Sequence, residues 1–145
     1  MKHLSALAFL TLAACANAGG LGTSDFATVG NIRVNQVSAD VFEVMSRPGG
    51  NPMAQYWCGA GNYAGQVLGA PAGARIYVVG EAGRAVTSDS LDAAQFSLKP
   101  AGQASGATGR KGTYGPRIGE DEFVADARRY CLIIGDPFAL FRTGL

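Results

Sequence analysis

The chain has 145 residues, which is enough for one domain with a single core. Its 12 Lys and Arg residues nearly balance its 11 Asp and Glu residues, so we expect no basic surface that binds nucleic acid. The one histidine, His3, lies ahead of the predicted domain. The domain therefore lacks the imidazole of a Ser-His-Asp triad, a Cys-His dyad, a histidine zinc site or a histidine-ligated haem. We predict no catalytic residue, no metal and no cofactor.

The N-terminal residues have the pattern of an export signal. A short basic start precedes an apolar run from Leu4 to Ala14, which is too short to span a membrane core of roughly 30 Å but is typical of a secretory signal. Two cleavage signals overlap after this run. Ala16-Asn17-Ala18 is an A-x-A site for ordinary signal peptidase, whereas a cut before Cys15 would place that cysteine at the new N-terminus.

The residues Leu12-Ala13-Ala14-Cys15 resemble the lipobox of bacterial lipoproteins, which has an aliphatic residue, two small residues and the lipid-accepting cysteine. The resemblance covers only this signal; the rest of the chain resembles no family of known function. It implies a signal peptide at 1–14, a lipid on Cys15 and a stable anchor in the bacterial envelope, with the periplasmic face of the outer membrane favoured. The A-x-A cut would instead give a soluble periplasmic or secreted protein.

Two cysteines remain once lipidation or cleavage removes Cys15 from the thiol count: Cys58 and Cys131. An even pair in an oxidising compartment is typical of a disulfide, which we predict here. A reactive or metal-binding thiol pair is the alternative interpretation, but no third ligand lies close in the sequence.

The predicted elements begin after a Gly-rich lipidated tether at 15–28. Residues 32–37 and 41–45 predict a β-hairpin. Asn51 and Pro52 are favourable N-cap and first-turn residues, and predict a helix that Gly69 ends. Apolar side chains repeat along it at helical spacing and predict a buried stripe: Met53, Tyr56, Trp57, Ala60, Tyr63, Ala64, Val67 and Leu68. Small residues form a second face that a neighbouring element can approach closely: Ala54, Cys58, Gly61 and Gly65.

The second half of the chain predicts short strands and a long loop. Residues 74–80 predict a strand, followed by a turn at 81–84, the start of a return strand at 85–87 and a short strand at 96–98. The loop 101–119 carries basic and aromatic side chains that could bind an anionic ligand or a glycan: Arg110, Lys111, Tyr114 and Arg117. We take these residues as the candidate ligand-binding site; a flexible surface loop is the alternative.

The last predicted helix spans 120–131, with acidic residues in its first turn and Arg128 and Arg129 in its last. Residues 132–134 fit either a helix or a strand. The apolar tail at 138–142 fits packing on the core or docking on a partner.

Together these elements predict a single α+β domain at 29–145, with a small antiparallel sheet, two helices on one face and one disulfide. The leading functional hypothesis is a small non-enzymatic envelope lipoprotein, an accessory or binding domain attached to a membrane and possessing an envelope protein partner. One alternative is a periplasmic ligand carrier or a non-histidine enzyme that uses the 101–119 loop with a carboxylate such as Asp89. Another is a protein-interaction module that uses the C-terminal tail.

Overall fold

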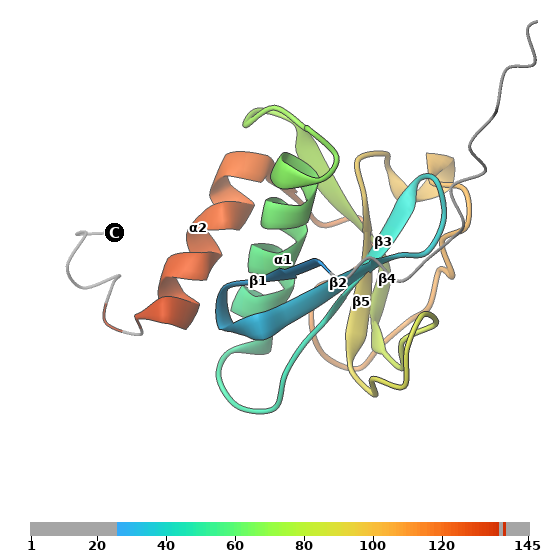
Figure 1. Cartoon of the computed structure of the whole chain (residues 1–145). Helices are drawn as coiled ribbons and strands as arrows, with labels where there is room; N and C mark the ends of the chain where they lie inside the picture. The colour runs from blue at the N-terminus through green and yellow to red at the C-terminus, as the bar shows by residue number, and fades with distance from the viewer. Residues whose placement is uncertain (1–25, 137, 139–145) are drawn as a thin grey trace, which may run out of the picture.

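The chain forms one antiparallel sheet with two helices packed together, as seen in a computed structural model that describes residues 26–136 and 138 (Figure 1). This arrangement confirms the predicted α+β fold. The predicted signal peptide, Cys15 and most of the tether lie outside the described residues, as do Pro137 and the chain after Phe138. No helix within the described part of the chain combines the length and the hydropathy needed to cross a membrane.

The sheet has six strands in the order β1-β2-β3-β5-β4-β6, and every neighbouring pair is antiparallel. The strands are β1 (Phe26–Thr28), β2 (Ile32–Gln36), β3 (Val41–Met45), β4 (Arg75–Gly83), β5 (Ala93–Ser97) and β6 (Asp121–Phe123), the helices are α1 (Pro52–Gln66) and α2 (Val124–Gly135), and short 3-10 turns lie at Val29–Asn31 and Ala101–Gln103. The β2–β3 pair confirms the predicted hairpin. Register shifts between β4 and β5 mark irregular pairing at Val78–Gly83.

Helix α1 forms where its cap and apolar stripe predict it. The Asn51 side chain accepts a hydrogen bond from the Ala54 N–H, and Pro52 begins the helix. From Tyr56 to Ala64 the stripe is buried against β2, β3, β4 and β5, and Trp57 contacts Phe96 edge-on with ring centroids 5.2 Å apart. The prediction was wrong for Val67 and Leu68, which follow the helix and are 47% and 40% exposed. Gly69 follows the helix with φ +65°, the left-handed conformation that favours glycine. α1 therefore supplies one wall of the main core.

Helix α2 packs on the small-residue face of α1. A methyl group at Gly61 would lie 2.7 Å from the backbone nitrogen of Arg128 and 2.9 Å from the carbonyl carbon of Ala127, so only glycine permits this approach. The Cys58–Cys131 disulfide joins the two helices, with their Cα atoms 4.8 Å apart. The predicted bond is confirmed, and it links α1 to a helix rather than to a strand.

Four segments differ from the sequence prediction. Residues 121–123 form strand β6 at the edge of the sheet, so helix α2 begins at Val124 and not at residue 120. The helix continues through residues 132–134, which are therefore helical and not a strand. Residues 26–28, expected in the tether, form strand β1. The predicted turn at 81–84 is largely strand, and 85–87 forms no strand because two of its N–H groups bind the Glu43 carboxylate instead of a neighbouring strand.

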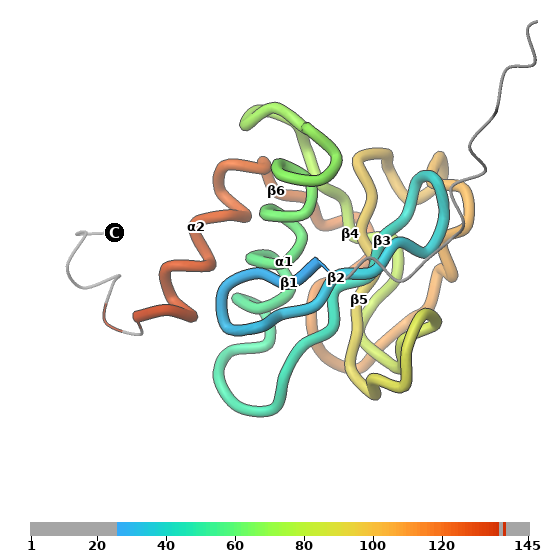
Figure 2. The backbone as a smooth tube through the Cα atoms, viewed as in Figure 1, coloured from blue at the N-terminus to red at the C-terminus, as the bar shows by residue number. Residues whose placement is uncertain are grey.

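The sheet has two unlike faces. Side chains such as Val34, Phe42 and Ile76 face α1 and form the main core. The opposite face, here called the outer face, is covered by two loops, 84–92 and 101–119 (Figure 2). Val41 and Val79 pack there against Ala104 of the longer loop. The outer face is the part of the fold where polar side chains converge.

Candidate functional site

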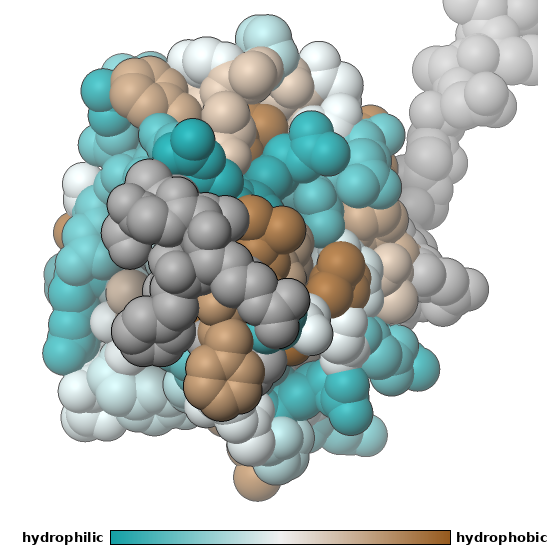
Figure 3. Space-filling view, turned by 90° about the vertical axis from the view of Figure 1, so that its left-hand side faces the viewer, coloured by the Kyte–Doolittle hydropathy of each residue, from teal (hydrophilic) through white to brown (hydrophobic). Residues whose placement is uncertain are grey.

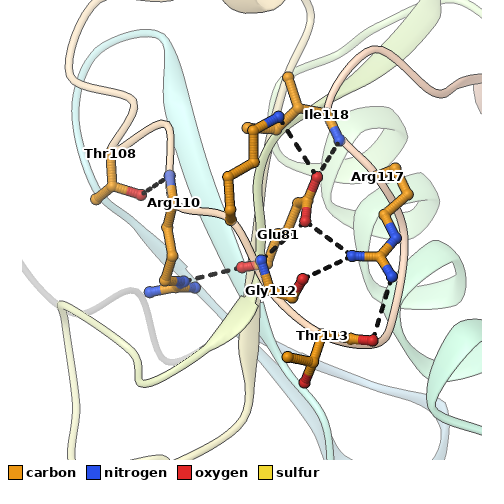
Figure 4. A network of polar contacts seen from close by, with 8 residues as sticks. Glu81, Thr108, Arg110, Gly112, Thr113, Arg117 and Ile118 are labelled. Carbon is orange, nitrogen blue, oxygen red and sulfur yellow. Dashed lines mark hydrogen bonds and ion pairs between the residues drawn. The ribbon is translucent and has the colours of Figure 1, made fainter.

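Two of the four predicted ligand-binding residues, Lys111 and Arg117, lie on the outer face beside the carboxylate of Glu81 in β4. Figure 4 shows this side chain enclosed by the 101–119 loop. Its oxygens accept hydrogen bonds from the backbone N–H groups of Gly112 and Ile118 and from the Arg117 guanidinium, at 2.8–3.2 Å. Lys111 forms a longer ion pair with the same carboxylate, at 3.7 Å. Two of the candidate cations therefore share one nearly buried anion.

Arg110 binds backbone carbonyl groups rather than a carboxylate. Its guanidinium donates to the carbonyl oxygens of Glu81, Arg84 and Ala93, at 2.5–2.9 Å. These oxygens belong to β4, to the chain after it and to β5, so one side chain connects the 101–119 loop to three points around the sheet. The geometry gives Arg110 a structural position, with its donors directed inward.

Tyr114 takes part in a second polar cluster, around Asp92. The Asp92 carboxylate accepts hydrogen bonds from the hydroxyl groups of Ser46, Tyr56 and Tyr114, the last at 2.6 Å. Burial raises the pKa of Asp92, but these hydrogen bonds outweigh that effect and the net pKa is lowered. Burial, together with the nearby Asp92 charge, raises the pKa of the Tyr56 phenol. The cluster links the residue after β3, α1 and both loops of the outer face.

Acid is expected to loosen the 101–119 loop through Glu81. Hydrogen bonds from the Gly112 and Ile118 N–H groups and from Arg117 lower the pKa of Glu81 from its ordinary value of 4.5 to about 2, despite its burial. Because the pKa of Glu81 is lower in the folded state than in the unfolded state, its ionised carboxylate stabilises the fold fully above pH 4.5. This contribution to the free energy of unfolding is lost as the pH falls toward about 2. Urea unfolding followed by Trp57 fluorescence should show that Glu81→Gln removes this part of the acid sensitivity. The matched variant Glu120→Gln, at an exposed carboxyl, should retain it; equal acid sensitivity in the wild type and Glu81→Gln would contradict the prediction.

The outer face also contains a cleft that the sequence analysis missed. This outer cleft has a volume of about 660 Å³ and lies between β2, the end of β3 and the 84–92 loop. The side chains that characterise it are Arg33, Asn35, Arg47, Thr87, Ser88 and Ser90. None of the predicted ligand-binding residues of the 101–119 loop lines it.

The wall of the outer cleft is held by a buried carboxylate. Glu43 in β3 is fully buried and accepts hydrogen bonds from the backbone N–H groups of Val86 and Thr87 and from the Thr87 hydroxyl. Asn35 donates to the same hydroxyl at 2.9 Å. A charged residue inside an apolar strand, Val-Phe-Glu-Val-Met, was the available signal in the sequence, because such a residue needs buried partners.

A second groove runs between α1 and α2, on the side of the molecule shown in Figure 3, where brown apolar and teal polar side chains mix. Val29 and Leu132 line it and are 44% and 54% exposed, and Arg128 and Arg129 also border it. The predicted C-terminal interaction segment lies outside the described residues, apart from Phe138. This groove combines apolar exposure with polar side chains, among which Arg128 donates a hydrogen bond to the Asn62 amide oxygen at 3.2 Å.

Comparisons with known proteins add no family to this description. No protein-family model, no curated protein and no solved structure matches the chain. Within residues 26–136 and 138, no group of three or more His, Cys, Asp or Glu side chains is arranged to hold a metal ion.

Proposed function

We propose that this protein is a small lipoprotein of the bacterial cell envelope, attached through Cys15, whose domain binds a ligand or partner and catalyses no reaction. The observation that supports an envelope location is the disulfide between α1 and α2. Disulfides persist in oxidising compartments and are rare in the cytosol. An export signal ending in a lipid-accepting cysteine would deliver the domain to such a compartment.

The state of the buried polar groups supports binding rather than catalysis. Glu43 and Glu81 accept several hydrogen bonds each from the loops they hold. Ser46 donates its hydroxyl hydrogen to Asp92, but the lowered pKa of Asp92 makes that carboxylate a weak general base near neutral pH. These groups hold the outer face in one conformation, as a preorganised binding surface requires.

The mass of the protein expressed in a bacterium with its own signal tests the anchor. We expect a chain that begins at Cys15 and carries a diacylglycerol and an additional acyl chain, recovered in the membrane fraction. Cys15→Ala should lose the added mass and leave the membrane. An unacylated wild-type chain that begins at Gly19 would refute the anchor and favour a diffusible protein.

A further inference from the structure

We infer that the outer cleft is a binding site for a small polar ligand that carries a phosphate or carboxylate group, with Arg33 as its main contact. This inference rests on the proposed binding function and names the ligand class and the site. It is independent of the lipid anchor, because it concerns only residues of the folded domain.

Arg33 lies at the cleft beside uncharged neighbours in the sheet. In the sheet register Arg33 lies between Ala27 of β1 and Met45 of β3, which carry no charge. Its side chain is exposed on the outer face, and it lines the cleft. Within the described part of the chain its guanidinium forms no hydrogen bond or ion pair, in contrast to Arg110 and Arg117. Arg33 therefore presents an uncompensated cation with a planar set of donors, which suits the paired oxygens of a carboxylate or phosphate.

A second guanidinium adds to the positive charge. Arg47 follows β3 and lines the same cleft, and its guanidinium donates a hydrogen bond to the carbonyl oxygen of Gly30, which lines a second hollow that Arg47 also borders. That bond leaves further donors of the guanidinium for a ligand, since arginine has five. Arg33 of β2 and Arg47, just after β3, both line the cleft, so both can contribute to binding an anionic group there.

No Asp or Glu side chain is among the described residues that line the cleft. Asp89 lies between two of those residues, Ser88 and Ser90, and is exposed. Two other carboxylates, Glu43 and Asp92, accept hydrogen bonds from the cleft wall and from Ser46, Tyr56 and Tyr114. Glu43 is fully buried and Asp92 is half-buried, and their hydrogen bonds hold the walls in place.

The size and the polar walls define the rest of the ligand. A cleft of about 660 Å³ falls within the usual range for small-molecule sites, roughly 300–1,000 Å³. Asn31, Ser88 and Ser90 line it beside the arginines, and the Ser90 N–H donates to the Ser88 hydroxyl oxygen. Amide and hydroxyl groups bind hydroxyl-bearing molecules, so we expect an anionic group attached to a polyhydroxylated body, such as a sugar phosphate or a sugar acid.

Binding can be tested by NMR titration of the full-chain protein, purified from membranes in a zwitterionic detergent, or without detergent if the chain is not acylated. The probes are glucose 6-phosphate, glucuronate and, as the neutral control, glucose. We expect saturable shifts of the backbone amides near Arg33, Arg47 and Ser88 with at least one anion, at a dissociation constant of roughly 10 µM to 1 mM. Glucose should cause no such shifts. A response to only one anion would assign the ligand to phosphates or to carboxylates.

Two charge-matched variants make the test specific. Arg33→Gln should weaken binding about tenfold to a hundredfold, as expected for the loss of hydrogen bonds to a charged group, while the amide spectrum stays folded. Arg129→Gln removes the same charge from exposed α2 and should bind like the wild type. Absence of saturable shifts, equal shifts with glucose, or equal weakening by the two variants would overturn the inference. Failure of the ligand-binding inference would appear in the NMR titration, whereas failure of the proposed lipid anchor would appear in the mass of the protein, so the two failures can be distinguished.

Discussion

Replacing both Cys58 and Cys131 with alanine should lower the free energy of unfolding by up to about 4.4 kcal/mol. The bond joins cysteines 73 residues apart, and the chain-entropy model gives this value for a closed loop of that length. Small domains have a total stability of only about 5–15 kcal/mol, so the loss is large. The three glycines of α1 add to the need for the bond, since each costs the helix about 1 kcal/mol relative to alanine.

Urea unfolding monitored by the buried Trp57 measures this effect. The wild type under reducing conditions should unfold at nearly the same urea concentration as the double variant, and reductant should not change the variant. If the oxidised and reduced wild type unfold at the same urea concentration, the disulfide does not stabilise the domain.

Gly61→Ala should lower the free energy of unfolding by about 1–3 kcal/mol, the usual cost of overpacking. The added methyl group would lie 2.7 Å from the Arg128 nitrogen and 2.9 Å from the Ala127 carbonyl carbon, and backbone atoms cannot rotate away as a side chain can. The helices would have to separate at the point where the disulfide holds them together.

Gly65→Ala is the matched control, one turn further along α1. Its methyl group would lie 3.6 Å from a Val124 methyl carbon and 3.8 Å from the Arg128 side chain, at ordinary contact distance. This variant should be as stable as the wild type or more stable by up to about 1 kcal/mol, because alanine favours helix. Thermal unfolding of both variants tests the packing, and equal destabilisation would show that close approach at Gly61 does not matter.

The parts of the fold that sequence analysis predicted well are those in which local signals agree. Asn51, Pro52 and the apolar stripe all favour one helix, and the small residues beside Cys58 indicate a close neighbour. The hairpin of β2 and β3 has apolar residues alternating at Ile32 and Val34 and a short turn, both of which are local.

The parts that it missed depend on distant partners. Residues 121–123 are acidic and resemble a helix start, but they pair with β4, where Arg75 binds Asp121 and lies 4.3 Å from the centre of the Phe123 ring. Val86 and Thr87 have strand propensity, yet the Glu43 carboxylate, more than 40 residues away, binds their N–H groups. Propensity cannot identify such partners.

The candidate site shows the same limit. The 101–119 loop was predicted as a site because a long loop carries several basic and aromatic side chains, but the structure pairs Arg117 and Lys111 with Glu81 and places Arg110 on backbone carbonyl groups. Arg33 is a single cation in an alternating strand, and its value as a contact depends on lacking a partner within the described residues. Sequence gives the number of cations, whereas only the fold shows which of them are neutralised.

The disulfide also changes how the protein responds to a protease. Cys58 and Cys131 close a covalent ring that contains β4, β5, β6 and the whole 101–119 loop. A single cut anywhere in that ring opens it without releasing a fragment, because the disulfide still joins the two parts of the chain. On a non-reducing gel the cleaved protein should therefore migrate as one species, and reductant should separate it into two. A protease can therefore nick the 101–119 loop while both halves of the outer face stay on one molecule.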